Sequence, residues 1–203
     1  MGKYKYEWRL VVVLTVISVV SAAILGVVNS LTEPVIQAQH ELAQQKALQE
    51  ALTTATEFEA EEAFLEALHQ SGQTGVVEVY RGYRDAETEG FVFIVDQKGY
   101  AGVIRMAVGV GQTGNLAGVT VISQSETPGL GAKVTDGDFL SQLAFQEATT
   151  QNQLAVTQDK GEVEAITSAT ISSRAVVHGV NMALAAAHSL SAVENRNGGV
   201  NVD

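Results

Sequence analysis

Residues 76–123 read VVEVYRGYRDAETEGFVFIVDQKGYAGVIRMAVGVGQTGNLAGVTVIS, a segment with four runs of β-branched and aromatic residues. The runs cover residues 76–80, 91–95, 100–110 and 116–123, and Gly, Asp and Asn residues separate them. Such runs are typical of strands, and turn residues between neighbouring runs favour hairpins. The segment therefore predicts an antiparallel meander, which forms the sheet of an α+β fold.

Residues 109–114 of this segment (GVGQTG) match the GxGxxG pattern of dinucleotide-binding proteins. That pattern binds a dinucleotide only where a helix follows the glycines. Residues 115–122 (NLAGVTVI) instead form the next predicted strand, and Gln112 to Asn115 are residues that tolerate turns. The glycines therefore predict a hairpin turn.

Towards the N-terminus, the run from Leu10 to Val28 (LVVVLTVISVVSAAILGVV) contains no charged side chain. About 20 apolar residues span a bilayer as a helix, whereas the apolar core of a signal peptide is usually about 7–15 residues long. Residues 21–23 (SAA) resemble a cleavage site, so a signal peptide is the alternative, but the apolar run continues beyond them. The sequence predicts a transmembrane anchor over residues 10–28 in contact with the lipid bilayer.

Basic residues precede this anchor, at Lys3, Lys5 and Arg9, with Glu7 as the opposing charge. Basic residues concentrate on the cytoplasmic side of membrane helices. We therefore expect a single-pass protein of the cell membrane, with residues 1–9 as a cytoplasmic N-terminus and the main domain on the extracytoplasmic side.

Residues 29–72 are predicted to form a helical connector between the anchor and the sheet. Thr32 and Glu33 precede Pro34 and predict a helix start there. The following segment to about His69 is rich in Ala, Leu, Gln and Glu, which favours helix, with a break near Thr53 and Thr54.

The remaining elements complete a predicted domain over residues 73–190. We expect a short helix at Asp138–Phe145, a strand at Val163–Ile166 and a long helix at Ile171–Leu190. The tail over residues 191–203 is polar and rich in Gly and Asn, so it is predicted to be disordered.

The composition excludes several functions. The chain has 12 Lys and Arg against 23 Asp and Glu, a net charge of −11, which disfavours binding of nucleic acid. It contains no cysteine, so disulfides, thiolate metal sites and cysteine-bound iron–sulfur clusters are excluded. The four histidines lack the spacing of a metal motif, and no GxSxG nucleophile is present. No metal site and no catalytic side chain is predicted.

Two segments remain as candidates for a binding site. The first, residues 125–134 (SETPGLGAKV), follows a predicted strand, and its glycines allow backbone N–H groups to approach a planar or anionic ligand beside Lys133. An ordinary glycine-rich connection is the alternative interpretation. The second, residues 164–174 (EAITSATISSR), places hydroxyl groups and Arg174 at a helix N-terminus, where anions bind. Helix capping accounts for only one of these hydroxyls.

These two segments, together with residues 98–104 (KGYAGVI), resemble the FMN-binding domain of the RnfG subunits of Rnf complexes. The NqrC subunits of sodium-translocating NADH:quinone reductases are similar. The anchor followed by Thr32-Glu33-Pro34 matches the same subunits, so the resemblance covers most of the chain. Two residues depart from the family pattern: Ser168 stands where Gly is usual, and Val103 where Pro is common.

The resemblance implies a covalent cofactor. In that family a flavin transferase joins FMN, with FAD as donor, to the last threonine of the second motif through a phosphoester. Carried onto this chain, the attachment residue is Thr170, which would make the chain a phosphoprotein, and Glu164 takes the acidic position upstream. The implied cofactor-binding residues are Glu126, Thr127, Gly129, Leu130, Gly131, Lys133, Ser168, Ala169, Ser172 and Ser173.

The function implied is that of a membrane-anchored flavoprotein that relays electrons within an Rnf-type ion-translocating oxidoreductase complex. Its partners would be the other subunits, and the chain alone would complete no turnover. One alternative is an anchored assembly subunit whose flavin site is degenerate at Ser168. Another is an FMN-domain oxidoreductase of a different respiratory complex, such as an NqrC-type subunit.

Overall fold

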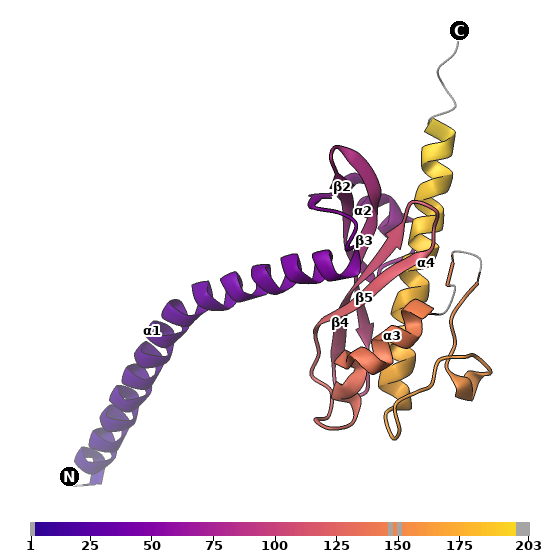
Figure 1. The fold of residues 1–203 in the computed structure, drawn as a ribbon. Coiled ribbons are helices and arrows are strands. Elements are labelled where there is room, and N and C mark those ends of the chain that lie inside the picture. Colours follow the sequence, from indigo (N-terminus) through magenta and orange to yellow (C-terminus); the bar gives the residue numbers. More distant parts are fainter. Residues whose placement is uncertain (1–2, 146–147, 150–151, 198–203) are drawn as a thin grey trace. The chain divides into compact units, whose positions relative to one another are not determined.

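The computed structural model describes residues 3–145, 148–149 and 152–197 (Figure 1). The chain divides into two compact units, residues 1–43 and residues 44–203. Helix α1 (Lys3–Ala51) belongs to both, because its last turns lie in the second unit.

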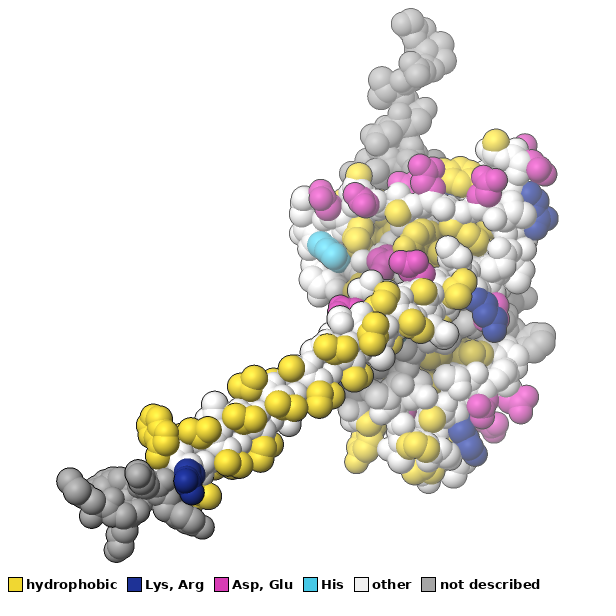
Figure 2. Space-filling view, turned by 90° about the vertical axis from the view of Figure 1, so that its left-hand side faces the viewer, with side chains coloured by type: hydrophobic (Ala, Val, Ile, Leu, Met, Phe, Trp, Pro, Cys, Tyr) yellow, Lys and Arg dark blue, Asp and Glu magenta, His cyan; other side chains and the backbone are white. Residues whose placement is uncertain are grey.

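The first unit is the N-terminal part of α1, whose described side chains are exposed from Trp8 to the end of the unit. An 18-residue window of this helix has a mean hydropathy of 2.8, and Figure 2 shows apolar side chains along it. By length and composition it is long enough to cross a membrane, as the sequence predicts. Apolar side chains without protein neighbours are stable in lipid, so the helix suits a membrane anchor.

The predicted helix start at Pro34 is wrong, because α1 passes through Pro34 without interruption. Proline inside a helix removes one backbone hydrogen bond and costs about 3 kcal/mol. Good helix formers on both sides offset this cost over a helix of 49 residues. The predicted break near Thr53 and Thr54 is confirmed, since α1 ends at Ala51.

The second unit is built on a five-stranded antiparallel sheet in the order β1-β2-β3-β4-β5, so the predicted meander is confirmed. The strands are β1 (Glu57–Ala60), β2 (Val76–Arg84), β3 (Glu87–Lys98), β4 (Val103–Gly111) and β5 (Leu116–Ser123). The predicted turn after β4 is also confirmed, because the Gly111 amide donates to the Asn115 carbonyl and Gly114 has a φ of +79°.

Strand β1 lies inside the segment predicted as a helical connector, so that prediction is wrong for residues 57–60. The Glu and Ala residues of this segment favour helix by themselves. Pairing with the edge of β2, where Phe58 faces Gly82, decides the conformation instead. Tertiary pairing thus overrides local propensity.

Both faces of the sheet are covered, and residues of β3 alternate between two apolar cores. Phe91, Phe93 and Val95 face α2 (Glu62–Gln70), α3 (Gly137–Phe145) and α4 (Thr170–Asn197). Val92 and Ile94 face the last turns of α1. Burial of each such side chain stabilises the fold by about 1.5–3 kcal/mol. The apolar run of β3 is continuous because it is buried on both faces.

Helix α4 lies against β3 and β4, and α3 lies against β5 (Figure 1). The predicted strand at Val163–Ile166 is wrong, since Val163 forms only an isolated bridge with Val156. The predicted disordered tail is wrong for residues 191–197, because α4 extends to Asn197. The rest of that predicted tail, residues 198–203, lies outside the described residues.

Candidate functional site

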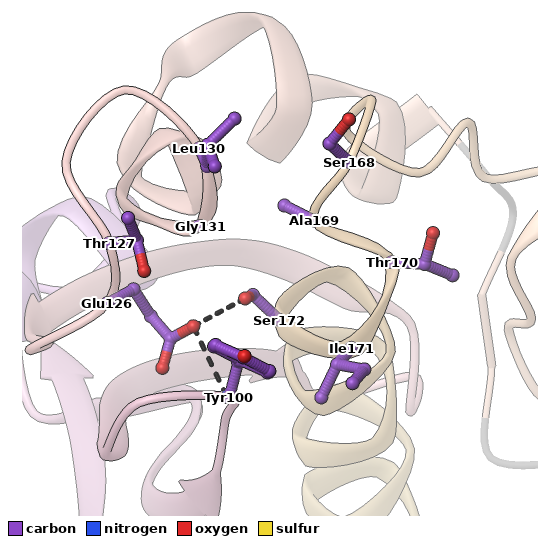
Figure 3. Close-up of a pocket in the computed structure, with 10 residues that line it drawn as sticks. All are labelled: Tyr100, Glu126, Thr127, Leu130, Gly131, Ser168, Ala169, Thr170, Ile171 and Ser172. Carbon is purple, nitrogen blue, oxygen red and sulfur yellow. Dashed lines mark hydrogen bonds between the residues drawn. The ribbon is translucent and has the colours of Figure 1, made fainter.

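A cavity of about 430 Å³ opens where three connecting segments meet. These segments are the turn between β3 and β4, the loop that follows β5, and the start of α4 (Figure 3). The two segments proposed from sequence, far apart along the chain, thus face each other across one cavity. Its lining residues are Tyr100, Glu126, Thr127, Leu130, Gly131, Ser168, Ala169, Thr170, Ile171 and Ser172.

Glu126, on the loop after β5, is hydrogen-bonded to both of the other segments and so connects all three. The residue is only 5% exposed. Its carboxylate accepts hydrogen bonds from both of the other segments. The amides of Tyr100, Ala101 and Gly102 donate to it at 3.2, 2.9 and 3.2 Å. The Ser172 hydroxyl donates to it at 2.5 Å (Figure 3).

Two glycines make room for this carboxylate. A Cβ at Gly99 would lie 2.5 Å from Glu126 Oε1, and one at Gly131 would lie 2.7 Å from Oε2. A carbon atom, which makes no hydrogen bond, cannot approach an oxygen so closely, so a side chain at either position would displace the carboxylate.

The protonation state of Glu126 follows from these contacts. Burial alone would raise the pKa of this carboxyl group. The hydrogen bonds from Ser172, Ala101, Gly102 and Tyr100 favour the ionised form and outweigh burial, so the pKa is lowered from its ordinary value of 4.5. Glu126 is therefore a carboxylate at neutral pH.

The start of α4 supplies the opposite wall. Thr170 is the first residue of this helix and is half-buried. Among the described residues, no acceptor is found for the amide N–H groups of Thr170, Ile171 and Ser172. The N-terminus of a helix carries partial positive charge, so this wall can hold an anionic group.

Ser168 precedes this helix with a φ of +64°, in the left-handed region that favours glycine. A residue with a Cβ in this region costs about 1–2 kcal/mol relative to glycine. The position where the sequence departs from the family pattern is therefore one that requires an unusual backbone conformation, and the serine adopts it.

Apolar side chains surround the mouth of the cavity. Tyr100 is 70% exposed, Leu130 43% and Ile171 51%, and Val103, which does not line the cavity, is also exposed. Among the described residues of the second unit, these four are the exposed large hydrophobic side chains. Apolar surface of this kind at a concave site is typical of sites for planar ligands.

Several residues predicted from sequence do not line the cavity. Gly129, on the loop after β5, and Lys133, in the 3-10 helix Gly131–Thr135, are exposed and lie outside the lining. Ser173 is fully buried, where its hydroxyl accepts from the Ile166 amide and donates to the Ala169 carbonyl. Arg174 forms a bidentate ion pair with Asp159 at 2.7 Å.

The acidic residue upstream of the motif, Glu164, is exposed, and its backbone amide donates to Gln142 Oε1. Its side chain does not line the cavity.

Sequence reasoning missed Tyr100 and Ile171 as lining residues. Tyr100 lies in the 98–104 segment that carries the resemblance, and Ile171 follows Thr170 directly. An aromatic or aliphatic residue beside a glycine-rich turn or at an exposed helix start is the signal that could have found them.

The segment of the chain that forms the cavity matches a known protein family. The model of the FMN-binding domain matches residues 99–185, which include every lining residue. Residues 99–185 of the second unit are therefore the FMN-binding domain of a flavoprotein. The model of the RnfG N-terminal region matches residues 8–51, which cover the apolar helix α1.

Relatives similar over almost the whole chain identify its family. It is 32% identical to the G subunit of the Na⁺-translocating ferredoxin:NAD⁺ oxidoreductase complex of Acetobacterium woodii, over 93% of this chain and 97% of the relative. It is 31% identical to the G subunit of the ion-translocating oxidoreductase complex of Methanosarcina acetivorans, over 91% and 96%. The chain belongs to the RnfG family.

A solved structure with the same fold is the C subunit of the Na⁺-translocating NADH-quinone reductase from Parabacteroides distasonis. It has a TM-score of 0.56 and 16% sequence identity, and the match covers 76% of this chain and 94% of that one. At this identity the likeness concerns the fold. The expected α+β architecture, with an apolar N-terminal helix and an antiparallel sheet, is confirmed.

Proposed function

We propose that this chain carries one FMN, joined through its phosphate to Thr170, and relays electrons within an Rnf-type ion-translocating complex in the membrane. The observation that carries this proposal is the position of Thr170 at the first turn of α4, in the wall of a cavity with an apolar mouth. The proposal extends to this chain what the names of its relatives say of them.

The residues around the cavity fit the two parts of FMN. The phosphate would lie at the N-terminus of α4, where the amides of residues 170–172 have no acceptor among the described residues. The aromatic ring system would meet the apolar side chains of Tyr100, Leu130 and Ile171. FMN supplies electron-transfer chemistry, and this chain supplies binding and orientation.

Attachment of FMN would require one nucleophilic displacement at phosphorus. The Thr170 hydroxyl oxygen would form a bond to the FMN phosphorus of FAD, and the bond from that phosphorus to the bridging oxygen of the pyrophosphate would break. AMP would leave with the bridging oxygen, and the proton of the hydroxyl would pass to it or to water. A flavin transferase would catalyse this step, because the one carboxylate among the described lining residues, Glu126, already accepts four hydrogen bonds. A covalent bond retains the cofactor whatever its affinity, which suits a domain on the extracytoplasmic side.

Ser168 argues against the alternative of a degenerate flavin site. Its φ of +64° is the conformation that a glycine would adopt easily, so the loop keeps the path that leads Thr170 to the cavity. We therefore infer that Ser168 lowers stability and leaves attachment possible.

Intact mass tests the attachment. The full chain is co-expressed with a flavin transferase, purified in detergent and weighed. The expected result is a gain equal to FMN minus water, with flavin fluorescence on the denatured chain, and complete loss of both in Thr170→Val or Thr170→Ala. Thr167→Ala, which changes an exposed residue near the motif, is the matched control and should keep the full gain.

A wild-type chain without the gain would contradict the covalent link. A gain that persists in Thr170→Ala would move the link to another residue. If only Ser168→Gly gains the mass, the degenerate-site alternative is correct.

The orientation in the membrane is tested separately. We propose that the N-terminus is cytoplasmic and the FMN-binding domain extracytoplasmic, on the basis of Lys3, Lys5 and Arg9. Protease added outside spheroplasts should digest the domain, and full protection in sealed spheroplasts with digestion after lysis would reverse the orientation.

A further inference from the structure

Glu126 differs from the other lining residues because its hydrogen-bonding capacity is already used. A carboxylate offers about four lone-pair sites, and four donors from this chain occupy them. A bound ligand therefore gains no hydrogen bond from Glu126 without breaking one of these. What the residue offers the cavity is a negative charge in a fixed position.

Within the described wall of the cavity, this charge has no cation beside it. Among the described residues that line the cavity, none is Lys or Arg. Lys133 is exposed outside the lining, and the Arg174 guanidinium is bound to Asp159. Backbone amides and one hydroxyl stabilise the carboxylate with their dipoles, which leaves its full negative charge in the cavity wall.

We propose that Glu126 acts as a fixed charge that lowers the reduction potential of a flavin in this cavity, and that it holds the three cavity segments together. The inference rests on the proposed function, since it concerns FMN attached at Thr170. An electron delivered by a redox partner adds negative charge to the cavity unless a proton follows. A carboxylate in the wall opposes that addition, more strongly where the cavity excludes water.

The decisive comparison is between a variant that removes the charge and one that keeps it. Glu126→Gln retains the size of the side chain and loses the charge. Ser172→Ala removes one donor and retains the carboxylate. Spectroelectrochemical titration of the flavin-loaded full chain should give a midpoint potential more positive than wild type for Glu126→Gln, and no more positive than wild type for Ser172→Ala.

An unchanged potential in Glu126→Gln would overturn the proposal. So would an equal positive shift in both variants, because a loosened cavity would then explain the effect without the charge.

Thr127 provides a second series in case Glu126→Gln fails to fold. Its side chain lies at the cavity and is exposed, so substitutions there leave the core intact. Relative to Thr127→Gln, the midpoint potential should be more negative in Thr127→Glu and more positive in Thr127→Lys. Equal potentials across this series would overturn the proposal, because the flavin would then be insensitive to charge in this wall.

The structural half of the proposal is measured on the chain before flavin loading. Hydrogen exchange of the amides of residues 100–102 should be faster in Glu126→Ala than in wild type, and equal rates would overturn it. The mass of the wild-type chain separates failure of the proposed function from failure of this inference. No mass gain overturns the proposed function and the redox half of the inference, whereas a loaded chain with unmoved potentials overturns the redox half alone.

Discussion

Two contacts in the second unit are possible only because glycine has no side chain: that of the sheet with the end of α1, and that of the cavity segments with Glu126. They have different consequences. Under the last turns of α1, a Cβ at Gly109 would collide with the carbonyl oxygen of Ala51, and one at Gly118 would lie 2.8 Å from the same atom. At the cavity, a Cβ at Gly99 or Gly131 would collide with the Glu126 carboxylate.

The difference between the two contacts lies in what the glycines bring together. Under α1 they allow a helix backbone to lie directly on the sheet, within an apolar core. At the cavity they allow backbone amides to surround a buried charge. We therefore expect the first contact to govern the stability of the domain and the second to govern the flavin site.

The largest expected effect is that of Gly109→Ala. The new methyl group meets backbone, which cannot move aside as a flexible side chain can, so the free energy of unfolding should fall by about 2–3 kcal/mol. Chemical denaturation of the full chain in detergent measures it. Gly137→Ala, at a position where nothing lies within 4 Å, is the control and should change stability little. Equal stabilities for the two variants would contradict the packing role.

Gly131→Ala should break the other contact. Its methyl group would lie 2.6 Å from Ser172 Oγ and 2.7 Å from Glu126 Oε2, so both segments must shift. We expect a loss of about 1–2 kcal/mol in stability and flavin attachment slower by about tenfold, measured as the fraction of chain with the FMN mass over time. Gly109→Ala, assayed where it is still folded, should load at the wild-type rate. Normal loading of Gly131→Ala would show that the cavity tolerates displacement of the carboxylate.

The charge at Glu126 should make stability depend on pH. Because its pKa in the folded chain lies below 4.5, the ionised group stabilises the fold above that pH, and this contribution is lost as the pH falls through the folded pKa. Wild type should therefore lose more stability than Glu126→Gln when the pH is lowered from about 6 to about 3. Denaturation at a series of pH values measures this, and parallel curves would contradict it.

The smallest expected effect is that of Ser168→Gly. Glycine relieves the cost of a positive φ but increases the freedom of the unfolded chain, so stability should rise by about 0.5 kcal/mol. Ser168→Ala keeps a Cβ at the same φ and is the control. A Gly variant no more stable than the Ala variant would show that this position carries no strain.

The sequence predicted the meander because each strand of it is marked by its own residues and turns. It also predicted the anchor, since an uncharged run such as Leu10–Val28 needs no tertiary partner to be recognised. Strand β1 could not be predicted, because Glu57–Ala60 become a strand only through pairing with β2. The continuation of α1 through Pro34 likewise could not be predicted locally, because it depends on whether the helix formers on both sides offset the cost of the proline.

For the site, the sequence alone determined the candidates: the two motifs, with Thr170 among the hydroxyl residues before the last helix. The family resemblance then made Thr170 the proposed attachment residue and Ser168 a departure from the family pattern. Local chemistry, such as hydroxyls before a helix, is visible in the order of residues. Only the tertiary structure decided their roles. It separated Ser172, which binds Glu126, from Ser173, which binds backbone, and paired Arg174 with Asp159. It showed that Tyr100 and Ile171 line the cavity. It also showed that Glu126 is a buried carboxylate with four hydrogen bonds. The physical reason is that burial and hydrogen-bond partners belong to the folded chain, in which residues far apart in sequence come into contact.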